Sequence, residues 1–377
     1  MRFWPFRRRA SLSPPLPSED LLVTEERLRH AAEDVLEVQE RQIRGGVIVF
    51  RGRLRTDAPR ALDTLLGRFE PFGYTPFLRA ERDGVLVQAW PLGDLTQPAR
   101  PVLALTLFAL TVASTFVAGA FFFVGSETFD AYRALPFPGW LVSGTPFAVT
   151  LLAILGVHEF GHYFTARYYG AAVSLPYFIP APMLFGTFGA VIRMRSPARD
   201  RNSLFDIAAA GPLAGLLVAI PALILGLAWS RLVPAGDGSL GGFGYSLLTR
   251  AFVHLRFGEV DGMAVMTHPM ADAAWVGCFV TALNLFPVGQ LDGGRIAYAL
   301  SARRHRALGV ATWVVLLALG ALTGSVNWFV WAALLLVLVG FDHGPPLDDL
   351  TPLTPARRLL GIGCLVLAVL LIPPIPI

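Results

Sequence analysis

Long uncharged stretches constrain the fold of this chain more than any other feature. Val102–Val124 contains no charged residue, and at 1.5 Å per residue it can span the hydrocarbon core of a bilayer as one helix. Similar apolar stretches follow at Trp140–Ala166, Leu204–Trp229, Ala274–Ala302, Leu308–Leu322, Val326–Val339 and Leu359–Ile372. The last three are short or poorly flanked. The pattern therefore predicts an all-α polytopic membrane protein with six or seven spans.

Composition agrees with an integral, multi-pass membrane protein. Of 377 residues, 54% are hydrophobic and only 15% are charged, and the net charge is +4. The arginines fall mainly on one side of the predicted spans: in the first hundred residues, at Arg167, between Arg193 and Arg201, at Arg303, Arg304 and Arg306, and at Arg357 and Arg358. The positive-inside rule makes that side cytoplasmic. We therefore interpret the positive charge as membrane orientation and predict no nucleic-acid partner.

The first hundred residues follow a different pattern from the rest. Residues 1–19 are predicted to be a disordered basic tail, and 20–92 a small cytoplasmic α+β domain. We expect helices at Glu19–Ile43 and Pro59–Phe69, and strands at Gly46–Leu54, Tyr74–Arg79 and Gly84–Trp90. A proline-rich linker, 93–101, then leads to a transmembrane domain at 102–377, whose predicted catalytic core is 140–305.

The second apolar stretch carries the motif His158-Glu159-Phe160-Gly161-His162. On a helix, residues four apart share a face, so His158 and His162 can bind one metal ion. Two imidazoles at this spacing suit zinc, and Glu159 is placed to act on a water molecule at the metal. Such five-residue matches arise by chance in soluble proteins. Inside a membrane span, ionisable residues are costly, so the motif favours a functional site.

Zinc in a catalytic site needs a third protein ligand, and three carboxylates lie in apolar surroundings: Asp206, Asp292 and Asp342. Asp292 is the best placed of the three. It follows Pro287 and Gly289 and precedes Gly293 and Gly294, a combination that breaks a helix and can turn the carboxylate toward the histidines. We predict one Zn²⁺ per chain, with Asp206 and Asp342 as the alternatives for the third ligand.

A second irregular stretch, Leu175–Met194, is apolar but rich in proline and glycine. Irregular backbone at membrane depth must be buried in protein or line a water-filled cavity. We therefore predict a re-entrant hairpin here. The glycines of Gly211-Pro212 and Gly215 in the third span are expected to permit close helix packing.

Four motifs in order resemble the site-2 protease family of intramembrane zinc metalloproteases. They are His158–His162, Gly186–Ala190, Ala209–Gly215 and Asn284-x-x-Pro287-x-x-x-Leu291-Asp292-Gly293. Tyr177–Pro180 and Pro287–Arg295 further resemble the plant and cyanobacterial branch known for the ethylene-dependent gravitropism-deficient and yellow-green proteins. The resemblance covers about residues 140 to 305.

The resemblance implies a role for each matching residue. His158, His162 and Asp292 would bind zinc, Glu159 would be the general base and then the acid, and Asn284 would hydrogen-bond substrate or the oxyanion. An edge strand, Gly186-Thr187-Phe188-Gly189-Ala190, would pair with an unwound substrate. The partners implied are a transmembrane protein substrate and the lipid bilayer. The identity of the substrate and the oligomeric state do not follow from the sequence.

Two rival hypotheses remain at this stage. One is a catalytically silent scaffold or chaperone with the same fold, although Glu159 and Asp292 argue against it. The other is a transporter with broken helices, which the His158–His162 motif and the lack of visible inverted repeats weaken. For localisation we predict a bacterial plasma membrane, with a plastid membrane as the alternative.

Overall fold

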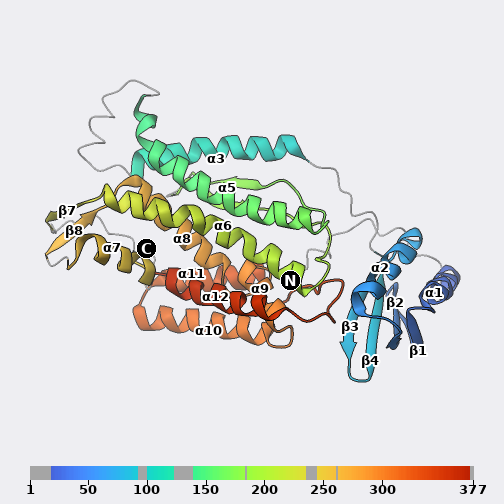
Figure 1. Cartoon of the computed structure of the whole chain (residues 1–377). Coiled ribbons are helices and arrows are strands. Elements are labelled where there is room, and N and C mark those ends of the chain that lie inside the picture. Colours follow the sequence, from blue (N-terminus) through green and yellow to red (C-terminus); the bar gives the residue numbers. More distant parts are fainter. Residues whose placement is uncertain are drawn as a thin grey trace.

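A computed structural model describes residues 18–91, 100–122, 139–182, 185–234, 244–259 and 262–373. The predicted disordered tail and the predicted linker lie almost entirely outside these ranges. Figure 1 shows an N-terminal region of two helices and a sheet, and a helical region that holds the rest of the chain. The mostly helical architecture and the N-terminal α+β region agree with the prediction.

The N-terminal region consists of residues 18–91. Its elements are α1 (Ser18–Ala32), β1 (Leu36–Arg44), β2 (Val47–Leu54), α2 (Ala58–Phe69), a short 3₁₀ helix η2 (Glu70–Phe72), β3 (Thr75–Glu81) and β4 (Gly84–Trp90). The strands form one antiparallel sheet in the order β1-β2-β4-β3. The region is held together by an apolar core that includes Leu28 of α1, Phe50 of β2 and Leu65 of α2.

The expected helix at Glu19–Ile43 is wrong beyond Ala32, because β1 takes its second half. Gly45 and Gly46 both have positive φ, 56° and 83°, and they connect β1 to β2 as a two-residue hairpin turn. This turn pairs Arg44 with Val47, and β1 pairs with β2 from there to Leu36, with one register shift between Val38 and Glu40. A Gly-Gly pair between two apolar runs is a hairpin signal, and it could have revealed the strand.

In the described ranges, the helical region contains nine α-helices, two short helical turns and two short β-hairpins. The helices are α3 (Pro101–Phe122), α5 (Thr145–Tyr168), α6 (Arg201–Ala228), α7 (Leu247–Phe257), α8 (Pro269–Asn284), α9 (Asp292–Leu300), α10 (His305–Thr323), α11 (Val326–Leu334) and α12 (Pro355–Leu371). A 3₁₀ helix, η3 (Gly139–Gly144), precedes α5, and a π-helical turn, η4 (Leu335–Val339), continues α11.

Four helices in the described ranges are long and apolar enough to cross a membrane: Pro101–Phe121, Leu141–Tyr168, Arg201–Ala228 and His305–Thr323. The other predicted spans correspond to shorter helices. The stretch predicted as a broken span, Ala274–Ala302, is indeed interrupted, because α8 ends at Asn284 and α9 begins at Asp292. Pro287 and the positive-φ Gly289 lie in the interruption.

The irregular stretch at Leu175–Met194 contains a hairpin, β5 (Tyr177–Pro180) paired antiparallel with β6 (Thr187–Val191). It packs on α3, where the rings of Phe108 and Phe178 lie 5.0 Å apart and the Ser114 hydroxyl donates to the Gly186 carbonyl at 2.6 Å. A second hairpin, β7 (Arg231–Pro234) with β8 (Met263–Met266), lies at the far end of α6 (Figure 1).

Candidate metal centre

The two histidines of the motif lie one turn apart on α5, where α5 packs against α6 and α8. Both are buried, with 3% of each residue exposed. Their Nε2 atoms are 3.2 Å apart. The Oδ2 atom of Asp292, the first residue of α9, is 3.1 Å from Nε2 of His162 and 3.5 Å from Nε2 of His158. The break between α8 and α9 therefore places Asp292 beside the histidines.

These three ligand atoms fit a tetrahedral zinc site. Zinc binds nitrogen and oxygen at about 2.0–2.1 Å, so the corners of the tetrahedron are about 3.3 Å apart. The three observed separations, 3.1, 3.2 and 3.5 Å, surround that value. Among the residues that the structure describes, this is the single group of three or more histidine, cysteine or acidic side chains that could hold a metal ion.

Neighbouring groups orient the three candidate ligands. The ring of His162 contacts the carbonyl oxygen of Ile207 through Nδ1 at 2.6 Å. A proton on Nδ1 donates to that carbonyl and leaves Nε2 with a free lone pair toward the cluster. The other oxygen of Asp292, Oδ1, faces the guanidinium of Arg295 at 3.7 Å. The carboxylate thus presents one oxygen to the histidines and the other to a cation.

Sequence reasoning missed both of these orienting groups. A backbone carbonyl leaves no mark in the sequence, so the contact from Ile207 could not have been found there. Arg295 could have been, because it follows Asp292 by three residues and so lies near it on a helix.

Small residues of α6 allow the histidines to lie so close to it. A Cβ atom added to Gly211 would lie 2.1 Å from Nε2 of His162, and one added to Gly215 would lie 3.2 Å from Nδ1 of His158. The predicted close packing at these glycines is confirmed, and the structure adds that the packing is against the candidate ligands themselves. Pro212 lies inside α6 and lacks the N–H that would donate to the carbonyl of Ala208, four residues earlier.

Glu159 and Asn284 lie at the edge of the cluster. Glu159 is buried, with 4% exposed, and its carboxylate lies near the backbone of Ile192, the residue after β6. Asn284 is the last residue of α8, and its Nδ2 atom is 3.4 Å from Nε2 of His158. The structure therefore brings together all five residues that the sequence placed at the site.

The two alternative carboxylates are elsewhere. Asp206 accepts two hydrogen bonds from Arg357, both at 2.7 Å, and a third from the hydroxyl of Tyr169. Burial and the adjacent carboxylate raise the pKa of the Tyr169 phenol, which keeps it a donor. Asp342 is exposed after η4. Neither belongs to the cluster, so the choice among the three carboxylates falls on Asp292.

The predicted substrate strand corresponds closely to β6, which Gly186 precedes and which contains Thr187, Phe188, Gly189 and Ala190. In the described part of the chain β6 pairs with β5 alone, so its other edge is open. Phe188 is 69% exposed. The end of β6 leads directly to Ile192 and so to Glu159.

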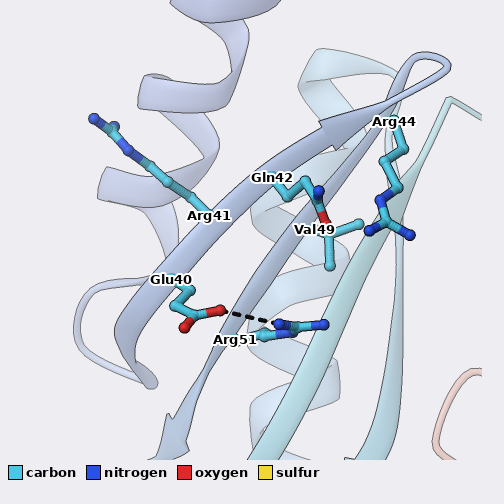
Figure 2. Close-up of a pocket in the computed structure, with 6 residues that line it drawn as sticks. All are labelled: Glu40, Arg41, Gln42, Arg44, Val49 and Arg51. Carbon is cyan, nitrogen blue, oxygen red and sulfur yellow. Dashed lines mark hydrogen bonds and ion pairs between the residues drawn. The ribbon is translucent and has the colours of Figure 1, made fainter.

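A surface hollow in the N-terminal region differs from the buried metal centre (Figure 2). It lies on β1 and β2 and is lined by Glu40, Arg41, Gln42, Arg44, Val49 and Arg51. Arg51 donates to Glu40 at 3.0 Å, and Arg41 to Glu26 at 3.1 Å. Its charges are of both signs and largely exposed. We therefore assign no chemistry to it.

The sequence matches known proteins over the same segment. The model of the peptidase family M50 matches residues 146–326, which contain every residue of the cluster. The probable chloroplastic zinc metalloprotease EGY2 of Arabidopsis thaliana is 28% identical over 346 residues, 88% of this chain and 60% of that protein. The probable chloroplastic zinc metalloprotease EGY1 of Oryza sativa subsp. japonica is 34% identical over 256 residues, 65% of this chain and 43% of the relative.

The chain thus spans less than two thirds of the length of these relatives. No solved structure shows a significant match. The resemblance to site-2 proteases and to their plant branch is confirmed by the matched segment and by the relatives. The buried His-His-Asp cluster lies inside the segment that the model of peptidase family M50 matches.

Proposed function

We propose that this chain is an intramembrane zinc metalloendopeptidase, which hydrolyses peptide bonds within or near the transmembrane segments of protein substrates. One observation carries the proposal: a buried His158–His162–Asp292 cluster, with Glu159 beside it, lies partly on a helix long enough to cross a membrane. Ionisable residues in such a helix are costly, and a metal site gives each of them a role.

In this proposal one Zn²⁺ is held by Nε2 of His158, Nε2 of His162 and Oδ2 of Asp292. When bound, the ion supplies a Lewis acid that makes a water molecule easier to deprotonate and polarises a carbonyl. Glu159 accepts the proton of the attacking water and later gives it to the leaving nitrogen. Asn284 hydrogen-bonds the carbonyl oxygen of the scissile peptide. Ile207 and Arg295 keep His162 and Asp292 in the orientation that the site requires.

The substrate is proposed to bind as an added strand on β6. A transmembrane helix hides its peptide bonds in its own hydrogen bonds, so a protease must unwind it and pair the freed backbone. The open edge of β6 offers such pairing, and the contact between Ile192 and Glu159 supports a path from that edge to the general base.

The chain is a multi-pass membrane protein, and we propose the finer placement from charge. The ion pairs of Arg199, Arg201 and Arg357 all lie at the end of the helical region that adjoins the N-terminal region. The positive-inside rule makes this end cytoplasmic. With the four long helices, six or seven crossings follow if two or all three of the shorter helices α8, α11 and α12 also enter the bilayer. A bacterial plasma membrane and, after the chloroplastic names of the relatives, a plastid membrane are the two locations we propose.

The decisive experiment measures zinc and cleavage in the same variants. In detergent-purified protein we expect about one zinc per chain, lost in both His158→Ala and Asp292→Ala. Glu159→Gln should keep its zinc and lose cleavage of a reconstituted transmembrane substrate. Folded wild-type protein without zinc would refute the proposal. Zinc binding with no Glu159-dependent cleavage of any transmembrane substrate would favour the silent scaffold.

A further inference from the structure

A short segment of the chain joins the two regions of the molecule. It is Leu347-Asp348-Asp349, between η4 and α12, and we refer to it as the strap. The N–H of Leu78 in β3 donates to the carbonyl of Leu347 at 2.7 Å, and the N–H of Asp349 donates to the carbonyl of Leu78 at 3.0 Å. The strap therefore runs parallel to β3 and pairs with the edge that the sheet order leaves open.

The other edge of the strap pairs with the helical region. The N–H of Leu347 donates to the carbonyl of Ala198 at 2.9 Å, and the N–H of Asp348 donates to the backbone carbonyl of Arg199 at 2.8 Å. The side chain of Leu347 is buried in the core of the N-terminal region. The sheet of the N-terminal region is thus extended, through the strap, to the segment that precedes α6.

The side chain of Asp349 holds two helices at once. Its Oδ1 accepts from Nε of Arg201, the first residue of α6, at 2.8 Å, and its Oδ2 accepts from the hydroxyl of Tyr298 on α9 at 3.2 Å. The Asp349 side chain is only 13% exposed. A charge-assisted hydrogen bond at this degree of burial is stronger than a solvated surface pair.

Both helices lead from Asp349 to the metal centre. Along α6, Ile207 comes six residues after Arg201, and along α9, Asp292 comes six residues before Tyr298. Six residues of helix correspond to about 9 Å. Ile207 orients His162, and Asp292 is itself a candidate ligand. A shift between α6 and α9 would therefore move Ile207, which orients the ring of His162, relative to the ligand Asp292.

We propose that Asp349 is a positioning residue for the metal centre, and that docking of the N-terminal region through the strap and metal binding support each other. The Asp349 carboxylate fixes α6 against α9 at one end. At the other end the metal ion would join Asp292 of α9 to His162 of α5, whose ring contacts the Ile207 carbonyl of α6. Because coupling between two sites is reciprocal, a strap that strengthens zinc binding must itself be stabilised by zinc to the same extent. This inference goes beyond the proposed proteolysis, because it concerns metal affinity and needs no substrate.

The test compares Asp349→Asn and Tyr298→Phe with Asp34→Asn, all in the full chain. Asp34 pairs with Arg68 on the surface of the N-terminal region, far along the chain from the strap, and serves as the matched loss of a carboxylate charge. Zinc affinity is measured by competition with a chelator. The visible spectrum of the Co²⁺-loaded protein reports the ligand geometry. Amide exchange of residues 347–349 is followed with and without zinc.

We expect Asp349→Asn to weaken zinc binding by about tenfold, the lower end of the range for groups outside the ligand shell. Tyr298→Phe should weaken it less, and Asp34→Asn should not change it. The change in the Co²⁺ spectrum should be larger in Asp349→Asn than in Tyr298→Phe or Asp34→Asn. In the wild type, zinc should slow exchange of the strap amides.

Unchanged zinc affinity in Asp349→Asn, with faster exchange of the strap, would show that the strap only tethers the N-terminal region and would overturn the inference. If Asp349→Asn fails to fold, the wild-type exchange experiment decides, since strap amides insensitive to zinc overturn the inference by themselves. If the wild-type protein binds no zinc, both this inference and the proposed function are overturned. If the wild type binds zinc and Asp349→Asn and Tyr298→Phe bind it with the same affinity, this inference alone is overturned.

Discussion

The N-terminal region and the helical region differ in where their charged and their large apolar side chains lie. In the N-terminal region the interior is apolar, with Phe50 and Leu65 at 0% exposure, and nearly all charges lie outside. In the helical region large apolar side chains face outward, such as Leu105 at 69% and Leu217 at 78% exposure. His158, Glu159, His162 and Asp292 lie inside it. The N-terminal region thus has the charged surface that water solvates, and the helical region has the apolar surface that lipid solvates.

Because of this difference, a charged residue indicates a functional site in the helical region but not in the N-terminal region. In water a charged side chain costs little, so Glu40 or Arg51 on the sheet says nothing about function. In a segment that crosses hydrocarbon the same group is costly, and each one found there requires a partner or a role. Asp206 has a partner in Arg357, whereas His158, His162 and Asp292 contact one another.

The largest effect is expected from a methyl group at the centre of the helical region. In Gly211→Ala the new Cβ would lie 2.1 Å from Nε2 of His162, so the ring must move and zinc should be lost almost completely. Gly156→Ala on α5 is the control, because nothing lies within 4 Å of its added Cβ. Zinc content by elemental analysis checks both. Full zinc in Gly211→Ala would mean that His162 does not lie against α6.

Two phenylalanines, one buried in the N-terminal region and one exposed on the helical region, test the difference between the two surfaces. Phe50→Ala should destabilise the N-terminal region by about 3–5 kcal/mol, since it leaves a cavity in the core. Phe164→Ala on α5 should cost much less, because Phe164 is 65% exposed. Thermal unfolding in detergent, followed by circular dichroism and limited proteolysis, compares the two. Equal losses would contradict the outward orientation of the apolar face.

The ion pairs of the two regions should differ less, but in the same sense. Asp206→Asn removes the negative charge and one of the two oxygens that accept hydrogen bonds from Arg357 between α6 and α12, at a cost of about 1.5–3 kcal/mol. Asp34→Asn breaks an exposed pair with Arg68, and its unfolding temperature should not change measurably. Both variants are compared with the wild type by thermal unfolding at neutral pH. A larger loss for Asp34→Asn would reverse the ranking.

A pH dependence of stability is expected from His343, and near neutral pH it is the smallest of these effects. Burial lowers its pKa to about 3, while an unfolded histidine has a pKa of about 6.5. The unfolded state therefore binds a proton that the folded state does not, and stability falls as the pH drops from about 6.5 toward 3, by at most about 1.4 kcal/mol per pH unit.

In His343→Phe the slope of unfolding temperature against pH should become shallower over that interval. His30→Phe on α1 is the matched control, because the His30 side chain is 60% exposed. A slope that is the same in His343→Phe and in the wild type would show that other groups cause the acid sensitivity.

Much of the fold and nearly all of the candidate centre could be predicted from the sequence. The apolar face of α2, with Ala61, Leu62, Leu65 and Phe69 inside, follows from helical periodicity. The interrupted α8–α9 pair follows from Pro287 and its glycines. His158, Glu159 and His162 stand out because they are charged or polar in an apolar stretch. The missed strand β1 shows the limit, since apolar residues in a charged segment suited both a helix and an edge strand.

The sequence by itself determined which residues could bind a metal. The free-energy cost of an ionisable residue in an apolar segment, and the helical spacing of two histidines, both depend only on residues close together in the chain. Only the tertiary structure decided that Asp292, and not Asp206, joins the histidines, that Gly211 makes room for His162, and that the strap joins β3 to α6. Each of these contacts joins residues far apart in the chain. They depend on how whole helices pack, and no local pattern records that.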